Sequence, residues 1–410
     1  MDSFNDSDKD SCRSSSSVAS SSSRPSSSGK SPRFLTLKPC SSLVFFPPSE
    51  SKTGNDLYDD PDFKKLLQTG KMQLEDEKEV EISADDIITG SQLGSGQYGQ
   101  VFKCHVNKFP QFSLAYKSIR LDPEPRKKKL ILAELEATRK VKNHAYAVQT
   151  FCAITFETNL WFIMELMDFS LNDLIKERNK YESEKGTGNE VTVPESVVRL
   201  VAYACVQCLS YLSSLKIIHR DVKPANILIR WGTGEVKVGD FGISGRLMNS
   251  MAHTEIFQIH YVSPERLQID APPSNNSRSN RTSIPDSAET SHSTPSADKR
   301  RTYTVKNDIW AVGVTCYEFV TGRNPFNVQD RLFDTLTRIR EYDPPELSSL
   351  PNIEASQDLS SFVASCLIKD PEERPKYSQL KQTPFFKSFN EDTDPQSLTE
   401  YCRKFRICSS

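Results

Sequence analysis

The chain has 410 residues, of which 36% are hydrophobic and 26% are charged. This length can hold one large domain or two medium ones, and the composition is that of an ordinary soluble protein. The formal net charge is −2, because 52 Lys and Arg stand against 54 Asp and Glu. Bulk electrostatics therefore indicates neither a nucleic acid nor a membrane surface as a partner.

The ten cysteines are scattered, and the closest pair, Cys205 and Cys208, lies in an apolar helical run without a second Cys or His pair at metal-ligand spacing. We expect reduced core cysteines, as in a cytoplasmic or nuclear protein, rather than a zinc site or a disulfide framework. The first residues lack the basic segment and apolar run of a signal peptide. The most apolar helix, expected around residues 197–214, carries Arg199 and is too polar to span a bilayer.

Residues 1–83 are dominated by Ser, charge and turn formers, so we expect a disordered regulatory region. Segment 30–38 departs from this pattern, since Lys30 and Arg33 precede Leu35 and Leu37. Basic residues before alternating apolar ones can dock as an extended peptide, with the leucines in pockets. A chance cluster in a polar tail is the alternative.

Strand-like runs begin near residue 84, and residues 93–101 have the spacing G-x-G-x-x-G-x-V. Dinucleotide-binding folds share this glycine spacing, but there a helix follows. Here residues 101–106 read as a strand. The sequence therefore favours a hairpin that closes over phosphates, with backbone N–H groups close to the phosphate oxygens.

The next strand, expected over 113–119, places Lys117 inward among apolar neighbours. Such a lysine either extends its amine to the surface or is a buried cation that needs a carboxylate. A helix is expected over 126–142 from the spacing of its apolar residues. We take Glu134 as the partner of Lys117, with Glu136 as the less favoured substitute. In that pair the Lys117 amine could contact the phosphates of a bound nucleotide.

Further elements follow at regular intervals. Residues 160–167 read as a strand that runs into a connector, and residues 170–178 read as a helix before a polar loop over 181–192. A long helix over 194–214 is apolar on most sides, so we expect it to be the buried centre of the larger of two lobes.

The central stretch is 218–228, in which His219-Arg220-Asp221 precedes Lys223 and Asn226, followed by Asp240-Phe241-Gly242. This order is the catalytic-loop pattern of protein kinases. A lone His-Arg-Asp would suit a structural ion pair equally well, but the full string with Asp-Phe-Gly favours a catalytic loop.

Downstream, residues 270–301 are rich in Ser, Pro and Asn, and we expect a disordered, surface-exposed insertion. A buried helix is expected to resume at residue 305. In the C-terminal tail, residues 389–410, apolar side chains at helical spacing could dock on the domain or on a partner: Leu398, Tyr401, Cys402 and Phe405.

These motifs stand in the order found in eukaryotic protein kinases, and over residues 84–388 the chain resembles the mitogen-activated protein (MAP) kinase kinases, most closely the stress-pathway members. The residues that carry this resemblance are Ala84-Asp85-Asp86, Met164 to Asp168, His219 to Pro224, Asp240 to Gly245, and Ser250 with Thr254. The resemblance implies an α+β, bilobal kinase fold. It has a small antiparallel β-sheet lobe with one helix (84–167) and a larger, mainly helical lobe (168–388).

The resemblance also implies ATP and Mg²⁺ as cofactors and a role for each site residue. Asp221 would accept the proton of the attacking hydroxyl, Lys223 would reach the γ-phosphate, and Asn226 and Asp240 would bind the metal ions. Lys223 favours the Ser/Thr lineage over kinases that act on tyrosine alone. The residues implied in ATP binding, besides Lys117, are Leu93, Gly94, Ser95, Gly96, Gln97, Tyr98, Gly99, Val101, Ala115, Met164, Glu165 and Met167. Those implied in structural support are His219, Arg220, Glu265, Asp308 and Arg374.

In function, the resemblance implies dual specificity toward the Thr and Tyr of a MAP kinase activation loop, within a stress-signalling cascade. Ser250 and Thr254 would be phosphorylated by an upstream MAP kinase kinase kinase, and Arg220 and nearby cations would pair with the phosphates. The 30–38 segment becomes a candidate docking peptide for the MAP kinase.

One departure from the family pattern lies in the substrate-docking loop, where Phe257-Gln258 replaces the usual Gly and small polar residue. The competing hypothesis is a pseudokinase or scaffold that binds members of the pathway without phosphoryl transfer. Against it, the chain keeps the five residues whose loss usually marks a dead kinase: Lys117, Glu134, Asp221, Asn226 and Asp240.

Overall fold

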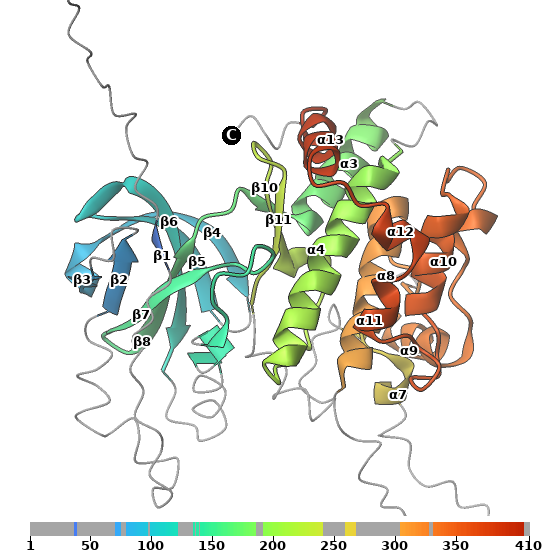
Figure 1. Cartoon of the computed structure of the whole chain (residues 1–410), viewed down its shortest axis with the longest axis horizontal. Helices are drawn as coiled ribbons and strands as arrows, with labels where there is room; N and C mark the ends of the chain where they lie inside the picture. Colours follow the sequence, from blue (N-terminus) through green and yellow to red (C-terminus); the bar gives the residue numbers. More distant parts are fainter. Residues whose placement is uncertain are drawn as a thin grey trace, which may run out of the picture. The chain divides into compact units, whose positions relative to one another are not determined.

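The computed structural model describes a β-sheet lobe and a mainly helical lobe (Figure 1). The residues it describes are 37–38, 70–74, 79–96, 99–121, 134–135, 137–138, 140–185, 192–240, 259–267, 304–327 and 331–405. The expected disorder of residues 1–36 and of the 270–301 insertion lies outside these ranges.

The small lobe is built on a five-stranded antiparallel sheet with the order β4-β5-β6-β8-β7. Its strands are β4 (Ile87–Gly96), β5 (Gly99–Val106), β6 (Phe109–Arg120), β7 (Thr150–Phe156) and β8 (Asn159–Glu165). The expected helix on this lobe is represented by five helical residues, Glu134, Leu135, Ala137, Thr138 and Lys140. The glycine-rich stretch forms the β4–β5 hairpin, as its sequence predicts.

A second, three-stranded sheet extends the small lobe toward the N-terminus. It consists of β1 (Leu37–Lys38), β2 (Gly70–Leu74) and β3 (Glu79–Ile82), followed by the short helix η1 (Ala84–Asp86). Met72 and Ile82 are fully buried in the same apolar cluster as the five-stranded sheet. The expectation of disorder through residue 83 is therefore corrected for 70–74 and 79–82, because their apolar side chains complete the small-lobe core.

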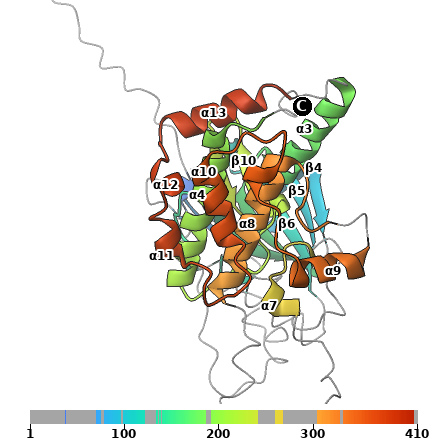
Figure 2. The same cartoon turned by 90° about the vertical axis from the view of Figure 1, so that its right-hand side faces the viewer.

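The large lobe is centred on α4 (Glu195–Ser214), which packs against α8 (Val305–Thr321), as Figures 1 and 2 show. The other helices are α3 (Leu171–Lys185), α7 (Pro264–Leu267), α9 (Leu332–Glu341), α10 (Gln357–Cys366), α11 (Tyr377–Leu380), α12 (Pro384–Lys387), α13 (Thr393–Cys402) and the short η2 (Pro224–Asn226) and η6 (Leu347–Ser349). A small sheet of order β11-β10-β9 is formed by β9 (Phe169–Ser170), β10 (Ile227–Arg230) and β11 (Glu235–Val238). Helix α3 reaches Lys185, so the polar loop begins later than 181.

Helix α4 alone, among the described helices, is long and apolar enough by length and composition to cross a membrane, and 61% of that stretch is buried inside the lobe. Its apolar side chains belong to the large-lobe core. Arg199 of α4 pairs with the buried Asp394, with Nε and Oδ2 2.9 Å apart. These contacts are those of a core helix. The described cysteines are buried and none forms a disulfide: Cys104, Cys152, Cys205, Cys208, Cys316, Cys366 and Cys402.

The C-terminal segment belongs to the large lobe and does not form a separate tail. Leu398, Tyr401 and Phe405 lie in its core, and α13 packs against α4. Thr399 Oγ1 donates to the carbonyl oxygen of Trp231 at 2.7 Å, in the β10–β11 turn. The boundary expected at residue 388 therefore moves to at least residue 405, because the apolar side chains of α13 are buried by the lobe itself.

Candidate active site

Lys117 lies in β6 with 7% of the residue exposed. Its Nζ is 3.2 Å from Glu134 Oε1 and 2.7 Å from Asp240 Oδ1. Glu134 is thus the carboxylate partner, and Glu136 lies outside the described residues. The second carboxylate, Asp240, comes from the segment that follows β11, so one ammonium group joins β6 to the large lobe.

Lys117 and Glu134 are buried while the Asp240 side chain is 47% exposed, and the pKa of each of the three groups is shifted. Burial lowers the pKa of Lys117, but the charges of Asp240 and Glu134 outweigh it and hold that pKa above its ordinary value. Burial raises the pKa of Glu134 to about 7, although the Lys117 ammonium opposes the rise. Desolvation opposes ionisation of Asp240, but the charge and hydrogen bond of Lys117 outweigh that effect, so the pKa of Asp240 is lowered. Asp240 is the carboxylate that stays ionised most firmly.

Asp221, Lys223 and Asn226 form a compact group on the catalytic loop. Lys223 Nζ lies 2.8 Å from Asp221 Oδ2, and Asn226 Nδ2 donates to the same oxygen at 2.9 Å. Asn226 Nδ2 also donates to the Asp221 carbonyl oxygen at 2.7 Å. Two donors therefore fix the orientation of one carboxylate oxygen.

The buried Asp308 of α8 holds the loop that carries Asp221. The backbone N–H groups of His219 and Arg220 donate to its two carboxylate oxygens at 3.0 and 2.8 Å. Arg220 has a φ of +68°, a left-handed conformation that is strained for a side chain of this size. The Asp308 hydrogen bonds offset that strain.

His219 connects this loop to the segment that carries Asp240. Its Nε2 lies 2.9 Å from the carbonyl oxygen of Gly239, and its Nδ1 accepts from the N–H of Asp221 at 3.3 Å. These partners require the tautomer with the proton on Nε2. The ring is fully buried, so it fixes the spacing between Asp221 and Asp240.

On the nucleotide side, the register of the sheet brings the predicted residues together. Val101 of β5 pairs with Lys117, and Ala115 of β6 pairs with Met164 of β8. A Cβ on Gly99 would lie 2.2 Å from the carbonyl oxygen of Ser118, so only glycine fits there. Leu93, Gly94, Ser95 and Gly96 are exposed in β4, Met167 is buried, and Gln97 and Tyr98 lie outside the described residues.

Asn226 and Asp240 have the chemistry of a magnesium site. An amide oxygen and a carboxylate are hard ligands, and Mg²⁺ is commonly bound by one or two carboxylates together with substrate phosphates. Within the described part of the chain, no group of three His, Cys, Asp or Glu side chains could hold a metal ion alone. The donor set therefore fits a metal that is shared with a phosphate ligand.

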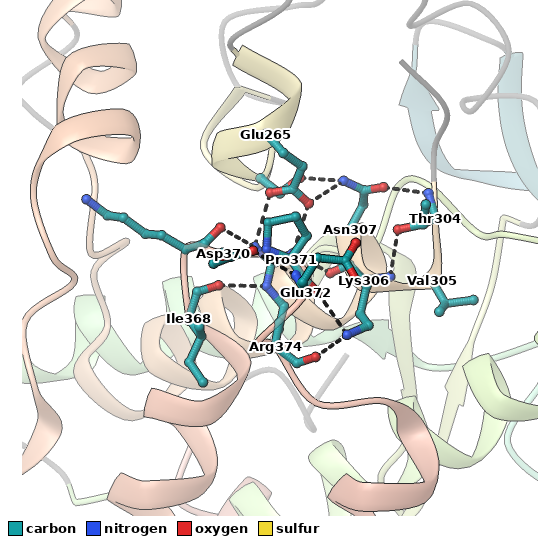
Figure 3. Close-up of polar contacts among 12 residues, drawn as sticks. Glu265, Thr304, Val305, Lys306, Asn307, Ile368, Asp370, Pro371, Glu372 and Arg374 are labelled. Atoms are coloured by element: carbon teal, nitrogen blue, oxygen red, sulfur yellow. Dashed lines mark hydrogen bonds and ion pairs between the residues drawn. The ribbon is translucent and has the colours of Figure 1, made fainter. Parts of the chain in front are cut away.

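Glu265 and Arg374 form a second ion pair in the large lobe (Figure 3). Arg374 donates to both carboxylate oxygens of Glu265 at 2.9 and 3.1 Å. It also donates to the carbonyl oxygens of Ile368 and Lys306 at 2.8 and 2.7 Å. This network ties α7 to the N-terminus of α8.

Several predicted residues lie outside the described ranges: Lys30, Arg33, Leu35, Ser250, Thr254, Phe257 and Gln258. Leu37 is in β1, where it pairs with Leu74. Two sets of side-chain contacts at the site were not predicted from the motifs. The Glu165 side chain binds Lys237 and Arg230, and Asn307 contacts Glu265.

Comparison with known proteins agrees with this geometry. The protein kinase domain model matches residues 87–284 and 288–386. The chain is 33% identical over 324 residues to the MAP kinase kinase PBS2 of Saccharomyces cerevisiae, covering 78% of this chain and 42% of PBS2. It is 30% identical over 327 residues to the dual specificity mitogen-activated protein kinase kinase hemipterous of Drosophila melanogaster, covering 79% and 24% of the two chains.

A third relative, the dual specificity mitogen-activated protein kinase kinase sek-1 of Caenorhabditis elegans, is 31% identical over 330 residues, which cover 78% of this chain and 86% of sek-1. The chain spans less than half the length of PBS2 and of hemipterous. A protein kinase domain implies ATP and typically Mg²⁺ as cofactors. The chain belongs to the protein kinase family and, within it, to the MAP kinase kinases.

Proposed function

We propose that this kinase is a dual-specificity MAP kinase kinase that phosphorylates the Thr and the Tyr in the activation loop of a MAP kinase. The observation that carries the catalytic part is the group Asp221, Lys223 and Asn226, held at hydrogen-bond distance on a fixed loop. The names of hemipterous and sek-1 support the dual specificity.

Asp221 orients the substrate hydroxyl and accepts its proton while the hydroxyl oxygen forms a bond to the γ-phosphorus of ATP and the β–γ bond breaks. The carboxylate is prepared for this by its two donors, Lys223 and Asn226. Lys223 also reaches the γ-phosphate, where its charge offsets the charge that develops in the transition state.

Lys117 binds the α- and β-phosphates, and Glu134 holds its amine in place. Asn226 and the Asp240 carboxylate would hold Mg²⁺, which would neutralise part of the phosphate charge. The residues of β4, β5 and β8 predicted from the motifs surround the nucleotide.

For regulation, we propose that a MAP kinase kinase kinase phosphorylates Ser250 and Thr254, and that the 30–38 segment docks on the MAP kinase. The proposal places the protein in a stress cascade of the cytoplasm or nucleus. A scaffold without phosphoryl transfer would not need the fixed Asp221 carboxylate or the Lys117–Glu134 pair.

The test uses a Ser250→Asp, Thr254→Asp form with ATP, magnesium and a panel of kinase-dead MAP kinases. Phospho-Thr and phospho-Tyr are read separately. The proposal expects both signals on at least one panel member. No signal above the Asp240→Asn control on any member would favour the scaffold.

A further inference from the structure

Asn307 is a buried residue of α8 that directly precedes Asp308, and 6% of it is exposed. Its Nδ2 donates to Ser263 Oγ at 2.6 Å and to Glu265 Oε1 at 2.8 Å. Its Oδ1 accepts from the backbone N–H of Thr304 at 2.7 Å. Figure 3 shows this amide between Thr304 and Glu265. Both amide donors and the amide oxygen are thus satisfied by named partners.

The segment that Asn307 holds, residues 259–267, is attached to the large lobe at further points. Tyr261 Oη donates to Glu318 Oε2 of α8 at 2.7 Å. Glu265 is fixed by Arg374. Ser263 is 1% exposed, so its hydroxyl has little access to water as an alternative partner. Loss of the Asn307 donor would leave that hydroxyl buried with one partner fewer.

This segment is attached to the helix that also holds the catalytic loop, because Asn307 and Asp308 are adjacent residues of α8. Burial raises the pKa of Tyr261 well above its ordinary value, Glu318 adds to the rise, and the charge of Asp221 contributes as well. In the sequence, Tyr261 lies three residues after Gln258.

Two neighbouring residues of α8 hold two different segments, the catalytic loop and residues 259–267. Consecutive side chains on a helix point about 100° apart, so they reach different neighbours. Asp308 holds the loop of Asp221, and Asn307 holds the segment of Ser263 and Glu265.

We infer that Asn307 is a positioning residue for the protein substrate: its amide fixes residues 259–265 relative to Asp221. The inference deepens the proposed function and rests on it for the identity of the substrate. Among the described residues, the side chain of Asn307 contacts Thr304, Ser263 and Glu265, none of them a predicted nucleotide or metal ligand. We therefore expect its effect in the step in which a substrate hydroxyl is presented.

A helix-capping role is the competing explanation, because Thr304 and Asn307 form a capping box at the start of α8. Two substitutions separate the roles. Asn307→Asp keeps the acceptor for the Thr304 N–H but removes both donors and places a carboxylate beside Glu265. Thr304→Ala keeps the contacts of the Asn307 side chain and removes the Oγ1 that accepts from the Lys306 N–H at 3.3 Å and from the backbone N–H of Asn307.

The experiment compares three forms of the 410-residue chain, each carrying Ser250→Asp and Thr254→Asp. The first has no further substitution, the second adds Asn307→Asp, and the third adds Thr304→Ala. For each it measures kcat/KM on a kinase-dead MAP kinase and on a generic basic polypeptide, and ATP hydrolysis without protein substrate. We expect Asn307→Asp to lower kcat/KM for protein substrates roughly 10- to 100-fold, mainly through KM, the scale of a small misplacement. ATP hydrolysis should stay within about two-fold, because Asp221 keeps its contacts.

Thr304→Ala should leave all three rates within about two-fold, since a lost cap affects stability rather than substrate presentation. Backbone amides of residues 259–267 should exchange faster with solvent in Asn307→Asp than in Thr304→Ala. If Asn307→Asp unfolds, Ser263→Ala removes one of the same hydrogen bonds without a new charge and should act in the same direction.

Equal rates for Asn307→Asp and Thr304→Ala would overturn the inference. So would a parallel fall of ATP hydrolysis and protein phosphorylation. Phosphorylation of the generic polypeptide but of no MAP kinase would overturn the proposed function instead, and the generic substrate would still report on Asn307.

Discussion

Glu165 at the end of β8 and Lys237 in β11 form an ion pair in which Nζ lies 2.7 and 2.8 Å from the two carboxylate oxygens. Arg230 of β10 adds a bond to Glu165 Oε2 at 3.0 Å and one to the Leu166 carbonyl oxygen at 3.0 Å. The chain enters β10 directly after Asn226 and leaves β11 two residues before Asp240. The strand that leads to the predicted adenine contacts is thus bound to the hairpin that carries the predicted metal ligands.

Glu165→Gln should therefore raise KM for ATP about 3- to 10-fold with little change in kcat, as expected for the loss of one or two charge-assisted hydrogen bonds. Steady-state kinetics at varied ATP measures it. Glu235→Gln is the matched control, because Glu235 is more exposed and pairs with Arg230 at the edge of the hairpin. Equal effects of the two substitutions would contradict a role for Glu165 in holding the end of β8 against the β10–β11 hairpin.

The Glu134 carboxyl should give the free energy of unfolding a specific pH dependence. Its pKa is raised by burial from 4.5 to about 7 in the folded chain. Between these values the folded chain binds a proton that the unfolded chain has lost, so this group's contribution to stability falls as the pH rises through the window. The advantage of the natural chain over Glu134→Gln should shrink by on the order of 1–2 kcal/mol between about pH 5.5 and 8. Urea unfolding at both pH values measures it, and an advantage that grows with pH would contradict the account.

The Arg199–Asp394 pair should be a main anchor of the C-terminal segment. Asp394 is 1% exposed, and Asp394→Ala leaves the Arg199 guanidinium partly buried beside a small apolar side chain. We expect a loss of about 3–5 kcal/mol in the free energy of unfolding. The exposed neighbour Asp392 is the control, and Asp392→Ala should change it by less than about 0.5 kcal/mol. Similar losses for both would show that α13 is not held by this pair.

Gly313 on α8 should tolerate no side chain, because an added Cβ would lie 2.7 Å from Cys366 Cβ and 2.9 Å from Leu367. Gly313→Ala should cost about 1–3 kcal/mol, although alanine is the better helix former. Gly232 has nothing within 4 Å of such a Cβ, so Gly232→Ala serves as control. A Gly313→Ala protein as stable as the natural chain in thermal unfolding would mean that α8 and α10 leave room for a methyl group at Gly313.

The motifs predicted the kinase fold and the Lys117–Glu134 pair, because phosphoryl transfer requires these residue types in a fixed order. They did not predict β2 and β3, since each strand has only two alternating apolar residues in a polar stretch, and only the tertiary core shows that Met72 and Ile82 are buried. The helical spacing of Leu398, Tyr401 and Phe405 was visible, but whether the domain or a partner buries them depends on the surface of α4. The contacts of Asn307 and Glu165 join segments far apart in sequence, and no local pattern reports such contacts.

The most direct test of the central claim is phosphosite mapping by mass spectrometry on a kinase-dead MAP kinase after incubation with the Ser250→Asp, Thr254→Asp chain, ATP and magnesium. The account predicts that the Thr and the Tyr of the activation-loop Thr-x-Tyr sequence are both modified on one peptide, and that Asp221→Asn abolishes both. Modification of other serines or threonines alone, or of the same peptide by the Asp221→Asn chain, would contradict it.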